Sequence, residues 1–510
     1  MLIQQLLTDN AMRRPDALAF RWVDRQKTLS FAAAVSEMEA AAGYLHDLGV
    51  RPGDRVTIFA HNGMDYLVSM FGAWRLGAIA SLVNVKFADE LDYYLADHTP
   101  GVIIYTHDMQ APVTRAAATL ALAPILVCMD GPQEGAHSLP ELMAARLPAP
   151  VDPGDDGAIA HLSYTSGTTG KPKGACLMHE PTMRATRCIA ERIRLSANDV
   201  SFGPTALSSS YQLVANLMAP LHVGAPVNVM GRWTPETGVA ALSATGATIL
   251  VANPTLLTDL LEQVRAGAAK PAALRMVMSG GGPVPPSLKR AFRDELGLPL
   301  VESYGQSELG GFVGLGAPEL LPDERLGAVG RPLPDKEVRI LDAAGREVAP
   351  GELGEICIAG GFMHGYWNRP EKTAEAIRGK FLHTGDAGTM DAEGYVTMRG
   401  RFSELIEVAG RTWFPRDIEE ALAAQPGIRE AALVGLPDPA LGTRPVAYVT
   451  GAGDAATLKA AIAPLLSYDL APLDIRHIDS FPMTPTGKIA KAELRQTAIA
   501  EMTPAHAHAS

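Results

Sequence analysis

Residues 164–174 read Tyr164-Thr165-Ser166-Gly167-Thr168-Thr169-Gly170-Lys171-Pro172-Lys173-Gly174. Most of these residues are glycines, hydroxyl residues or lysines, and the apolar run just before them, 158–162, predicts a buried strand. Glycines let successive backbone N–H groups turn toward an anion, and hydroxyls and lysines add donors and positive charge for phosphate oxygens. The stretch therefore predicts a phosphate-binding loop. An ordinary hairpin loop remains the alternative when the stretch is taken alone.

The spacing within this loop differs from that of the Walker A loop, which has four residues between its first glycine and its Gly-Lys pair. Here only Thr168 and Thr169 separate Gly167 from Gly170, and Pro172 follows Lys171. The loop is therefore not that of a P-loop NTPase.

Length and composition limit the class of protein. A chain of 510 residues is too long for one ordinary core, so two or more domains are expected. Apolar residues make up 47% and charged residues 20%, as in soluble globular proteins, and the net charge of −12 gives no general attraction to nucleic acid or anionic membrane. The four cysteines form no C-x-x-C pair, the N-terminus resembles no signal peptide, and no apolar run reaches membrane-spanning length. These features predict a cytoplasmic enzyme with no nucleic-acid partner and no integral membrane segment.

Strand-like and helix-like segments alternate through residue 105. Ser30 is placed to cap a helix that ends near Gly49, Asp89 is expected to cap a later short helix, and residues 130–157 are expected to be a surface connection. The alternation resumes from 181 to 303. This rhythm predicts an α/β fold with doubly wound, mostly parallel sheets.

Polar or glycine-rich turns follow several predicted strands. Gly280-Gly281-Gly282 follows a strand near 275–278, and residues 304–308, Tyr-Gly-Gln-Ser-Glu, follow another near 299–303. Ligands of doubly wound sheets bind at the carboxyl ends of strands, so these turns and the loop at 164–174 are expected to line one crevice. On their own, the glycines are equally compatible with a tight strand–helix turn, and Glu308 with a solvated loop carboxylate.

The C-terminal part has a different pattern. Short strands and turns from 325 to 400 predict a β-rich subdomain, and the remainder predicts a small α+β unit. We therefore expect a large multi-subdomain N-terminal domain over 1–401 and a small mobile C-terminal domain over 402–510.

Taken together, the motifs resemble those of the adenylate-forming superfamily, which includes AMP-dependent acyl- and aryl-CoA synthetases. The resemblance runs from about residue 10 to 500, and its motifs are the loop at 164–174, Tyr304–Glu308, 365–371 (Gly-Tyr-Trp-Asn-Arg-Pro-Glu), 384–386 (Thr-Gly-Asp), Gly400-Arg401 and 482–488 (Pro-Met-Thr-Pro-Thr-Gly-Lys). Any one of these motifs is weak evidence. Their occurrence in this order along one chain is highly specific.

The resemblance implies ATP, Mg²⁺ and coenzyme A as reactants and cofactor. A carboxylate would attack the α-phosphate of ATP, so catalysis would consist mainly of positioning and charge neutralisation. The implied ATP and AMP residues are Thr165, Ser166, Gly167, Thr168, Thr169 and Lys173 for the phosphates, Gly280, Gly281, Gly282 and Tyr304 for the adenine, Ser307 beside Glu308, and Asp386 with Arg401 for the ribose. Glu308 would be the metal ligand, because Mg²⁺ prefers hard oxygen donors.

The resemblance also assigns residues of the small domain. Lys488 would be the adenylation lysine, with Glu308 and Thr165 completing the catalytic set. The small domain would then rotate to allow thioester formation, with Ala409 and Gly410 beside the pantetheine arm of CoA. The hinge is expected near Ser403. Members of the family usually carry Asp or Lys at this position, so the effect of serine on the free energy of the rotation is left open.

The acyl pocket departs most from the family pattern, because 204–207 (Pro-Thr-Ala-Leu) stands where relatives often carry aromatic residues and a histidine. The candidate lining residues are Leu207, Ser208, Ser209, Asn253, Ser279, Gly305, Leu309, Gly310 and Gly311. None is charged, which disfavours amino acids and dicarboxylates. The small residues Gly310 and Gly311 are expected to leave room for an elongated or aromatic acid, so a medium-chain fatty acid or an aryl carboxylate is the predicted substrate.

The sequence thus predicts an AMP-forming carboxylate–CoA ligase, an acid–thiol ligase that converts a fatty or aryl acid to its acyl-adenylate and then to its CoA thioester. Two alternatives remain at this point. One is a standalone adenylation enzyme that loads a carrier protein, and the other is a nucleotide-binding protein without catalysis. The identity of the acid and the formation of a homodimer are left open.

Overall fold

The computed structural model describes residues 1–164, 171–466, 468–483 and 489–502. The chain divides into two compact units. The first comprises Met1–Val284, Leu288–Val338 and Ile358–His383, and the second comprises Pro285–Ser287, Arg339–Cys357 and Thr384–Ser510.

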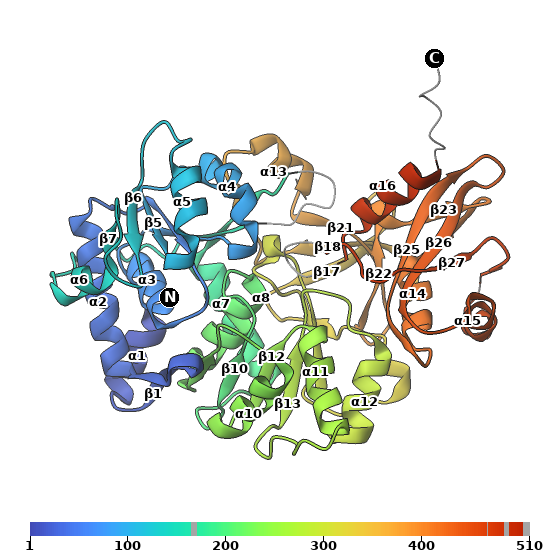
Figure 1. Cartoon of the computed structure of the whole chain (residues 1–510), viewed down its shortest axis with the longest axis horizontal. Helices are drawn as coiled ribbons and strands as arrows, with labels where there is room; N and C mark the ends of the chain where they lie inside the picture. The colour runs from blue at the N-terminus through green and yellow to red at the C-terminus, as the bar shows by residue number, and fades with distance from the viewer. Residues whose placement is uncertain (165–170, 467, 484–488, 503–510) are drawn as a thin grey trace. The chain divides into compact units, whose positions relative to one another are not determined.

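An eight-stranded sheet of the first unit contains both stems of the predicted phosphate loop, which are the strands that precede and follow it. Strands β5, β6 and β7 of this sheet are labelled in Figure 1. Its order is β19-β9-β8-β4-β3-β5-β6-β7. The strands from β8 to β7 pair in parallel, whereas β9 returns antiparallel to β8. The bounds are β3 Arg55–Phe59, β4 Ile79–Leu82, β5 Val102–Tyr105, β6 Ile125–Cys128, β7 His137–Ser138, β8 Ile159–Tyr164, β9 Gly174–Met178 and β19 Gly365–Tyr366.

A nine-stranded sheet forms the other half of the first unit, in the order β16-β15-β14-β13-β12-β10-β11-β1-β2. Its central strands, from β14 to β1, pair in parallel. The bounds are β1 Leu18–Trp22, β2 Lys27–Ser30, β10 Ser201–Gly203, β11 Val227–Val229, β12 Ile249–Ala252, β13 Met276–Ser279, β14 Leu300–Tyr304, β15 Gly314–Leu315 and β16 Arg331–Pro332.

Both sheets are buried on both faces, because alternate residues of a strand point to opposite sides. Val56 and Ile58 join a central core shared with the nine-stranded sheet, whereas Phe59 joins a separate outer core. Likewise Val251 contributes to the central core and Leu250 to a third one. Near-continuous apolar runs in these strands follow from this two-sided burial.

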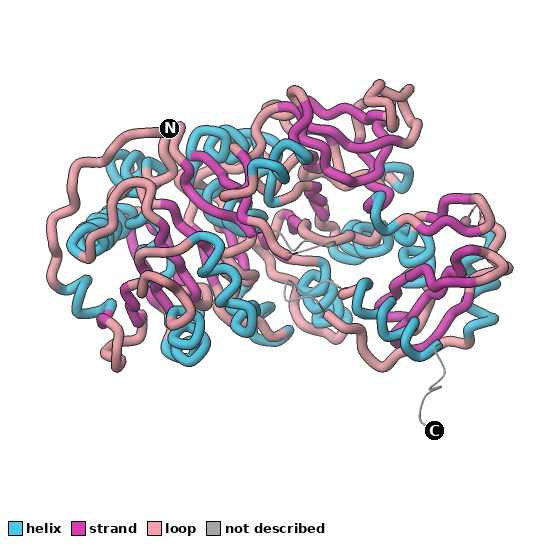
Figure 2. The backbone as a smooth tube through the Cα atoms, turned by 90° about the horizontal axis from the view of Figure 1, so that it is seen from above, coloured by secondary structure: helices cyan, strands magenta, loops and turns pink. Residues whose placement is uncertain are grey.

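Helices cover these sheets, as Figure 2 shows for the strands of the first unit. The central core contains residues of α1 Gln5–Arg13, α2 Phe31–Asp47, α3 Met64–Arg75, α7 His179–Arg192 and α9 Ala219–Val223. The outer cores contain residues of α4 Leu91–His98 and α5 Gln110–Ala117 on one sheet, and of α10 Pro235–Thr245, α11 Pro254–Arg265 and α12 Pro286–Leu296 on the other. This is the doubly wound α/β arrangement that the sequence predicted.

The second unit contains a three-stranded sheet in the order β25-β26-β27, and a two-stranded hairpin, β23-β24. The strands are β23 Ile406–Val408, β24 Arg411–Trp413, β25 Ile428–Asp438, β26 Gly442–Gly451 and β27 Asp474–His477, and the helices are α14 Pro415–Ala423, α15 Ala455–Ile462 and α16 Lys491–Met502. This confirms the small α+β unit. The β-rich segment, residues 337–401, belongs partly to each unit. Its elements are β17 Glu337–Leu341, β18 Gly354–Ala359, α13 Pro370–Ala376, β20 Ile377–Arg378, β21 Phe381–Met390 and β22 Val396–Arg401.

Two local predictions were wrong. Asp89 does not cap α4: it lies in the 3-10 turn Val85–Glu90, and the cap residue is Glu90, whose side chain makes no capping hydrogen bond. The stretch 130–157 is not a plain connection, because it contains β7 and α6 (Leu139–Ala144). The Ser30 cap is confirmed, since its hydroxyl accepts a hydrogen bond from the backbone N–H of Ala33.

Among the described residues, no helix combines the length and the apolar character needed to cross a membrane. The four cysteines, Cys128, Cys176, Cys188 and Cys357, are buried, and none of them forms a disulfide bond.

Candidate active site

The predicted phosphate loop connects two antiparallel strands. Tyr164, the last residue of β8, pairs in register with Gly174, the first residue of β9. Of the residues assigned to this site, Thr165, Ser166, Gly167, Thr168, Thr169 and, in the second unit, Lys488 lie outside the described residues. The two stems fix where the loop leaves the sheet and where it returns.

A chain of buried side chains holds the first stem. The hydroxyl of Tyr164 donates to Asp97 Oδ2 at 3.0 Å, and His98 Nδ1 lies 2.8 Å from the same hydroxyl oxygen. Because the single phenolic proton goes to Asp97, Nδ1 of His98 must be the protonated nitrogen. Nε2 then accepts the hydroxyl proton of Thr57, whose oxygen lies 2.6 Å away.

Burial favours the uncharged form of this histidine. It lowers the pKa of His98 to about 3, and the positive charge of Arg55 adds to the effect. The pKa of Asp97 is raised by burial, against the opposing influence of Tyr164 and of Arg369. Arg369 pairs with Asp97 Oδ1 at 2.8 Å. The first stem is therefore fixed to α4 and to the segment that carries Arg369.

The second stem is held by aromatic residues. The hydroxyl of Tyr93 donates to the carbonyl of Pro172 at 2.6 Å, and the ammonium of Lys171 lies 5.1 Å from the centre of the Tyr93 ring. The backbone N–H of Trp367 donates to the carbonyl of Gly174 at 2.8 Å. Each stem of the loop is thus held by its own set of contacts.

Lys173 and Glu308 both contact Tyr366. The Lys173 ammonium lies 4.4 Å from the centre of the Tyr366 ring, and the Tyr366 hydroxyl donates to Glu308 Oε1 at 2.7 Å. The structure therefore brings a predicted phosphate ligand and the predicted metal ligand to one side chain. Carboxylate oxygens are the donors that Mg²⁺ prefers, so the chemistry of Glu308 fits this ion.

Close backbone approach explains two of the glycines at the strand ends. A Cβ added at Gly280 would lie 2.0 Å from Ser303 Oγ and 3.0 Å from the Tyr211 ring. A Cβ added at Gly305 would lie 2.0 Å from the carbonyl oxygen of Gly311. Both glycines are therefore needed for packing, which is the structural alternative to a ligand contact. Tyr304 is buried at the end of β14.

The predicted acyl-pocket residues fall into two groups by exposure. Leu207, Ser279, Leu309 and Gly310 are buried, whereas Ser208, Asn253, Gly305 and Gly311 are half-buried and Ser209 is exposed. Asn253 also caps α11 by accepting from the N–H of Leu256. No described atom lies within 4 Å of a Cβ added at Gly310, but one added at Gly311 would meet Ser210 at 3.1 Å. Only Gly310 leaves the room that the sequence suggested for both.

The segment after this loop is a π-helix, Leu213–Met218, between α8 (Ser210–Gln212) and α9. Such wide turns are frequent at functional sites. Tyr211 packs against Phe312 with ring centres 5.7 Å apart, and within the described residues its buried hydroxyl has no hydrogen-bond partner.

In the second unit, the predicted ribose residues are paired. Asp386 on β21 lies opposite Arg401 on β22, and Arg401 Nε is 3.3 Å from Asp386 Oδ1. The backbone N–H of Asp386 donates to the hydroxyl of Thr384 at 3.0 Å. The carboxylate, 1% exposed in this structure, is thus held in a defined orientation.

The predicted hinge and CoA residues lie on exposed turns. Ser403 is in the 3-10 turn Phe402–Glu404. Ala409 and Gly410 form the two-residue loop of the hairpin β23-β24, with φ of 49° and 76°. Both angles are in the left-handed region that such hairpin loops require, and alanine is an uncommon residue there.

Sequence reasoning missed several residues of this site. Tyr366 and Arg369 belong to a motif that was recognised, but no role was assigned to either side chain. Tyr93, Asp97 and His98 are in α4, far from the loop in sequence, and no local pattern indicates that they contact it.

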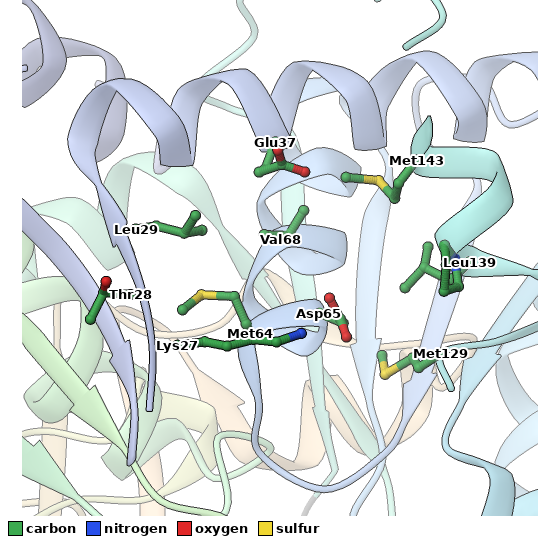
Figure 3. Close-up of a pocket in the computed structure, with 11 residues that line it drawn as sticks. Lys27, Thr28, Leu29, Glu37, Met64, Asp65, Val68, Met129, Leu139 and Met143 are labelled. Carbon is green, nitrogen blue, oxygen red and sulfur yellow. The ribbon is translucent and has the colours of Figure 1, made fainter. Parts of the chain in front are cut away.

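A cavity of about 360 Å³ lies elsewhere in the first unit (Figure 3). Residues of β2, α2, α3 and α6 line it, and Lys27 and Asp65 point into the same space. It shares no lining residue with the predicted ATP or acyl sites.

Two family models match this chain. The model described as AMP-binding enzyme matches residues 7–367, and the model described as AMP-binding enzyme C-terminal domain matches residues 417–488. Together they span both folds described above.

Curated relatives include feruloyl-CoA synthase of Amycolatopsis sp, which is 31% identical over 476 residues, covering 92% of this chain and 94% of the relative. Another relative is the fatty acid–[acyl-carrier-protein] ligase ScoC of Streptomyces coeruleorubidus, 31% identical over 481 residues, or 92% of this chain and 91% of the relative. Among solved structures, ATP-bound MatB from Rhodopseudomonas palustris matches with a TM-score of 0.89 and 26% identity, covering 99% of this chain and all of that one.

Proposed function

This chain belongs to the AMP-binding enzymes of the adenylate-forming superfamily, and from that premise we propose its reaction and the roles of its residues. It is an AMP-forming carboxylate–CoA ligase. A carboxylate oxygen of the acid attacks the α-phosphorus of ATP and pyrophosphate leaves. The sulfur of CoA then attacks the acyl carbon of the adenylate, and AMP leaves with the bonding electron pair. The match of both family models, over 7–367 and 417–488, supports the adenylation step, and the relative named feruloyl-CoA synthase supports CoA as the acceptor.

The geometry of the first unit supports the first half-reaction. Two anions must meet, so positive charge and fixed donors matter more than covalent help. Lys173 and the loop residues Thr165, Ser166, Thr168 and Thr169 hold the triphosphate, and Tyr304 with the turn at Gly280–Gly282 flanks the adenine. Glu308 with Ser307 beside it holds Mg²⁺, which when bound neutralises phosphate charge.

Residues of the second unit have the remaining roles in ribose binding, adenylation and CoA binding. Asp386, oriented by Arg401, accepts hydrogen bonds from the ribose hydroxyls, because a carboxylate is an acceptor only. Lys488 supplies the positive charge at the reacting carboxylate and α-phosphate. Ala409 and Gly410 let the pantetheine arm approach the backbone, and the small domain, from residue 402 on, turns about Ser403 between the two half-reactions. Buried cysteines that form no disulfide bonds suit the reducing cytoplasm where we place the enzyme.

We propose an aryl carboxylic acid as the substrate. The ring of Tyr211 lies next to the turn at Gly280 and packs against the ring of Phe312, and none of the candidate lining residues is charged. The feruloyl-CoA synthase among the relatives acts, by its name, on an aryl acid. A fatty acid is the second candidate, favoured by the relative that is a fatty acid–[acyl-carrier-protein] ligase.

Pyrophosphate exchange tests both parts of the proposal. Purified protein with Mg²⁺, ATP and labelled pyrophosphate should exchange label only when an acid is present, and faster with hydroxycinnamates or hydroxybenzoates than with octanoate. The adenylate should then transfer to CoA. Exchange with none of the acids would refute the ligase, and transfer to a holo-carrier protein but not to CoA would make it a carrier-loading enzyme.

A further inference from the structure

Tyr366 contacts two groups of opposite charge. It lies in β19, which pairs antiparallel with β9, so that Tyr366 is opposite Ala175, two residues after Lys173. Its ring faces the ammonium of Lys173 and its hydroxyl donates to Glu308. The side chain is 8% exposed. A single ring therefore connects the second stem of the phosphate loop to the turn after β14.

The surrounding backbone fixes this ring. The N–H of Tyr366 donates to the hydroxyl of Thr373 at 2.9 Å, and the N–H of Trp367 donates to Gly174. The N–H of Met363 donates to the carbonyl of Glu308 at 2.7 Å. The segment 363–367 thus contacts Glu308 through both its backbone and its side chain, and a mobile ring is not expected here.

The two contacts use different parts of tyrosine. The face of the ring carries the negative part of the quadrupole, which attracts an ammonium, whereas the hydroxyl proton attracts a carboxylate in a charge-assisted hydrogen bond. Lys173 and Glu308 form no ion pair with each other in the described part of the chain. Tyr366 therefore links the two charged groups through separate parts of one side chain.

We infer that Tyr366 is a positioning residue for the adenylation half-reaction, holding the metal-binding carboxylate and the phosphate-binding ammonium at a fixed spacing. This rests on the proposed roles of Glu308 and Lys173. The hydroxyl restricts the rotamer of Glu308, so that a carboxylate oxygen is already oriented when metal and nucleotide arrive. Thioester formation does not use the triphosphate, so that step does not depend on Tyr366.

The test compares Tyr366→Phe, which keeps the ring and removes the hydroxyl, with the wild type. Mn²⁺ binding in the presence of ATP, measured by electron paramagnetic resonance without any acid, should weaken roughly tenfold, in line with the loss of a hydrogen bond to a charged group. The Mg²⁺ concentration for half-maximal pyrophosphate exchange should rise by a similar factor. Thioester formation from synthetic acyl-adenylate should be unchanged. Tyr366→Leu, which also removes the ring, should in addition raise the KM for ATP.

Tyr66→Phe is the matched control, because Tyr66 is 1% exposed and its hydroxyl has no hydrogen-bond partner among the described residues. Unchanged Mn²⁺ binding in Tyr366→Phe would overturn the inference, and so would an equal loss of both half-reactions, which indicates a merely structural role. If the wild type exchanges with no acid while Tyr366→Phe still weakens Mn²⁺ binding, the proposed reaction fails and the positioning role stands.

Discussion

Three buried histidines should make the first unit sensitive to mild acid. His98, His161 and His179 are at most 2% exposed, and burial lowers the pKa values of their imidazoles to about 3, 3 and 4. His179 Nδ1 accepts the N–H of Ile3, His98 accepts from Thr57, and neither nitrogen of His161 has a partner among the described residues. Protonation in the folded state would therefore break contacts or leave a charge buried.

The size of the effect follows from linkage. Each histidine has a folded pKa below its unfolded value of about 6.5, so the unfolded chain takes up protons first and stability falls as the pH drops below about 6.5. At pH 5 each of the three costs about 2 kcal/mol relative to pH 8, or about 6 kcal/mol together. That is comparable with the whole stability of many proteins. Asp65 and Asp97 act in the opposite direction, because burial raises the pKa of each.

A single variant separates the histidine effect from the carboxylates. His161→Leu removes one titrating ring without removing a hydrogen bond seen in the structure. Between pH 8 and pH 5, the melting temperature of the first unit should fall less in this variant than in the wild type, by about 3 °C for about 2 kcal/mol. Scanning calorimetry at several pH values measures this difference. His137→Gln, at an exposed position, is the control. Parallel decreases in wild type and His161→Leu would refute the reasoning.

Three further predictions concern packing and the CoA step. Lys289→Met should destabilise the first unit by about 3–5 kcal/mol. The reason is that Lys289, 3% exposed, pairs with Glu302 and donates to the carbonyls of Leu326 and Ala328. Urea unfolding measures the loss of stability, and a loss below about 1 kcal/mol would contradict the prediction. Gly305→Ala should lower the stability of the first unit by about 1–3 kcal/mol, because the added Cβ would clash with the Gly311 backbone. Gly282→Ala, whose Cβ would meet no described atom within 4 Å, should leave the melting temperature unchanged. Equal changes in melting temperature for the two variants would disprove the clash. Ala409→Asn should stabilise the second unit by up to about 1 kcal/mol, because asparagine tolerates the left-handed region, and should slow thioester formation but not exchange; an unchanged thioester rate would remove this turn from the CoA site.

Much of the fold followed from the sequence because the strands are buried on both faces. Apolar runs such as 102–105 and 249–252 are nearly continuous, and glycines or caps such as Ser30 mark where the helices between them begin and end. Short elements without such runs were missed, among them β7 and α6 in the stretch expected to be a connection. Their place depends on neighbours distant in the sequence.

Site residues that belong to a recognised motif could be predicted from the sequence. Site residues that support the motif from distant parts of the chain could not. Asp386 and Arg401 were predicted together, and the structure pairs them across adjacent strands. The structure was needed to identify Asp97, His98 and Arg369 as residues that support the loop. Helix α4 lies about 70 residues before the loop in the sequence, and Arg369 lies about 200 residues after it. Gly311 shows the opposite case. A small residue suggested free space, but a side chain there would be crowded by Ser210, whose backbone lies 3.1 Å from the position of a Cβ.

The most direct test of the account is the effect of Lys488→Ala on the two half-reactions measured in parallel. Acid-dependent ATP–pyrophosphate exchange should be abolished, while CoA thioester formation from synthetic acyl-adenylate should proceed at close to the wild-type rate, because this lysine serves only the attack on the α-phosphate. Exchange at the wild-type rate, or an equal loss of both half-reactions, would contradict the account.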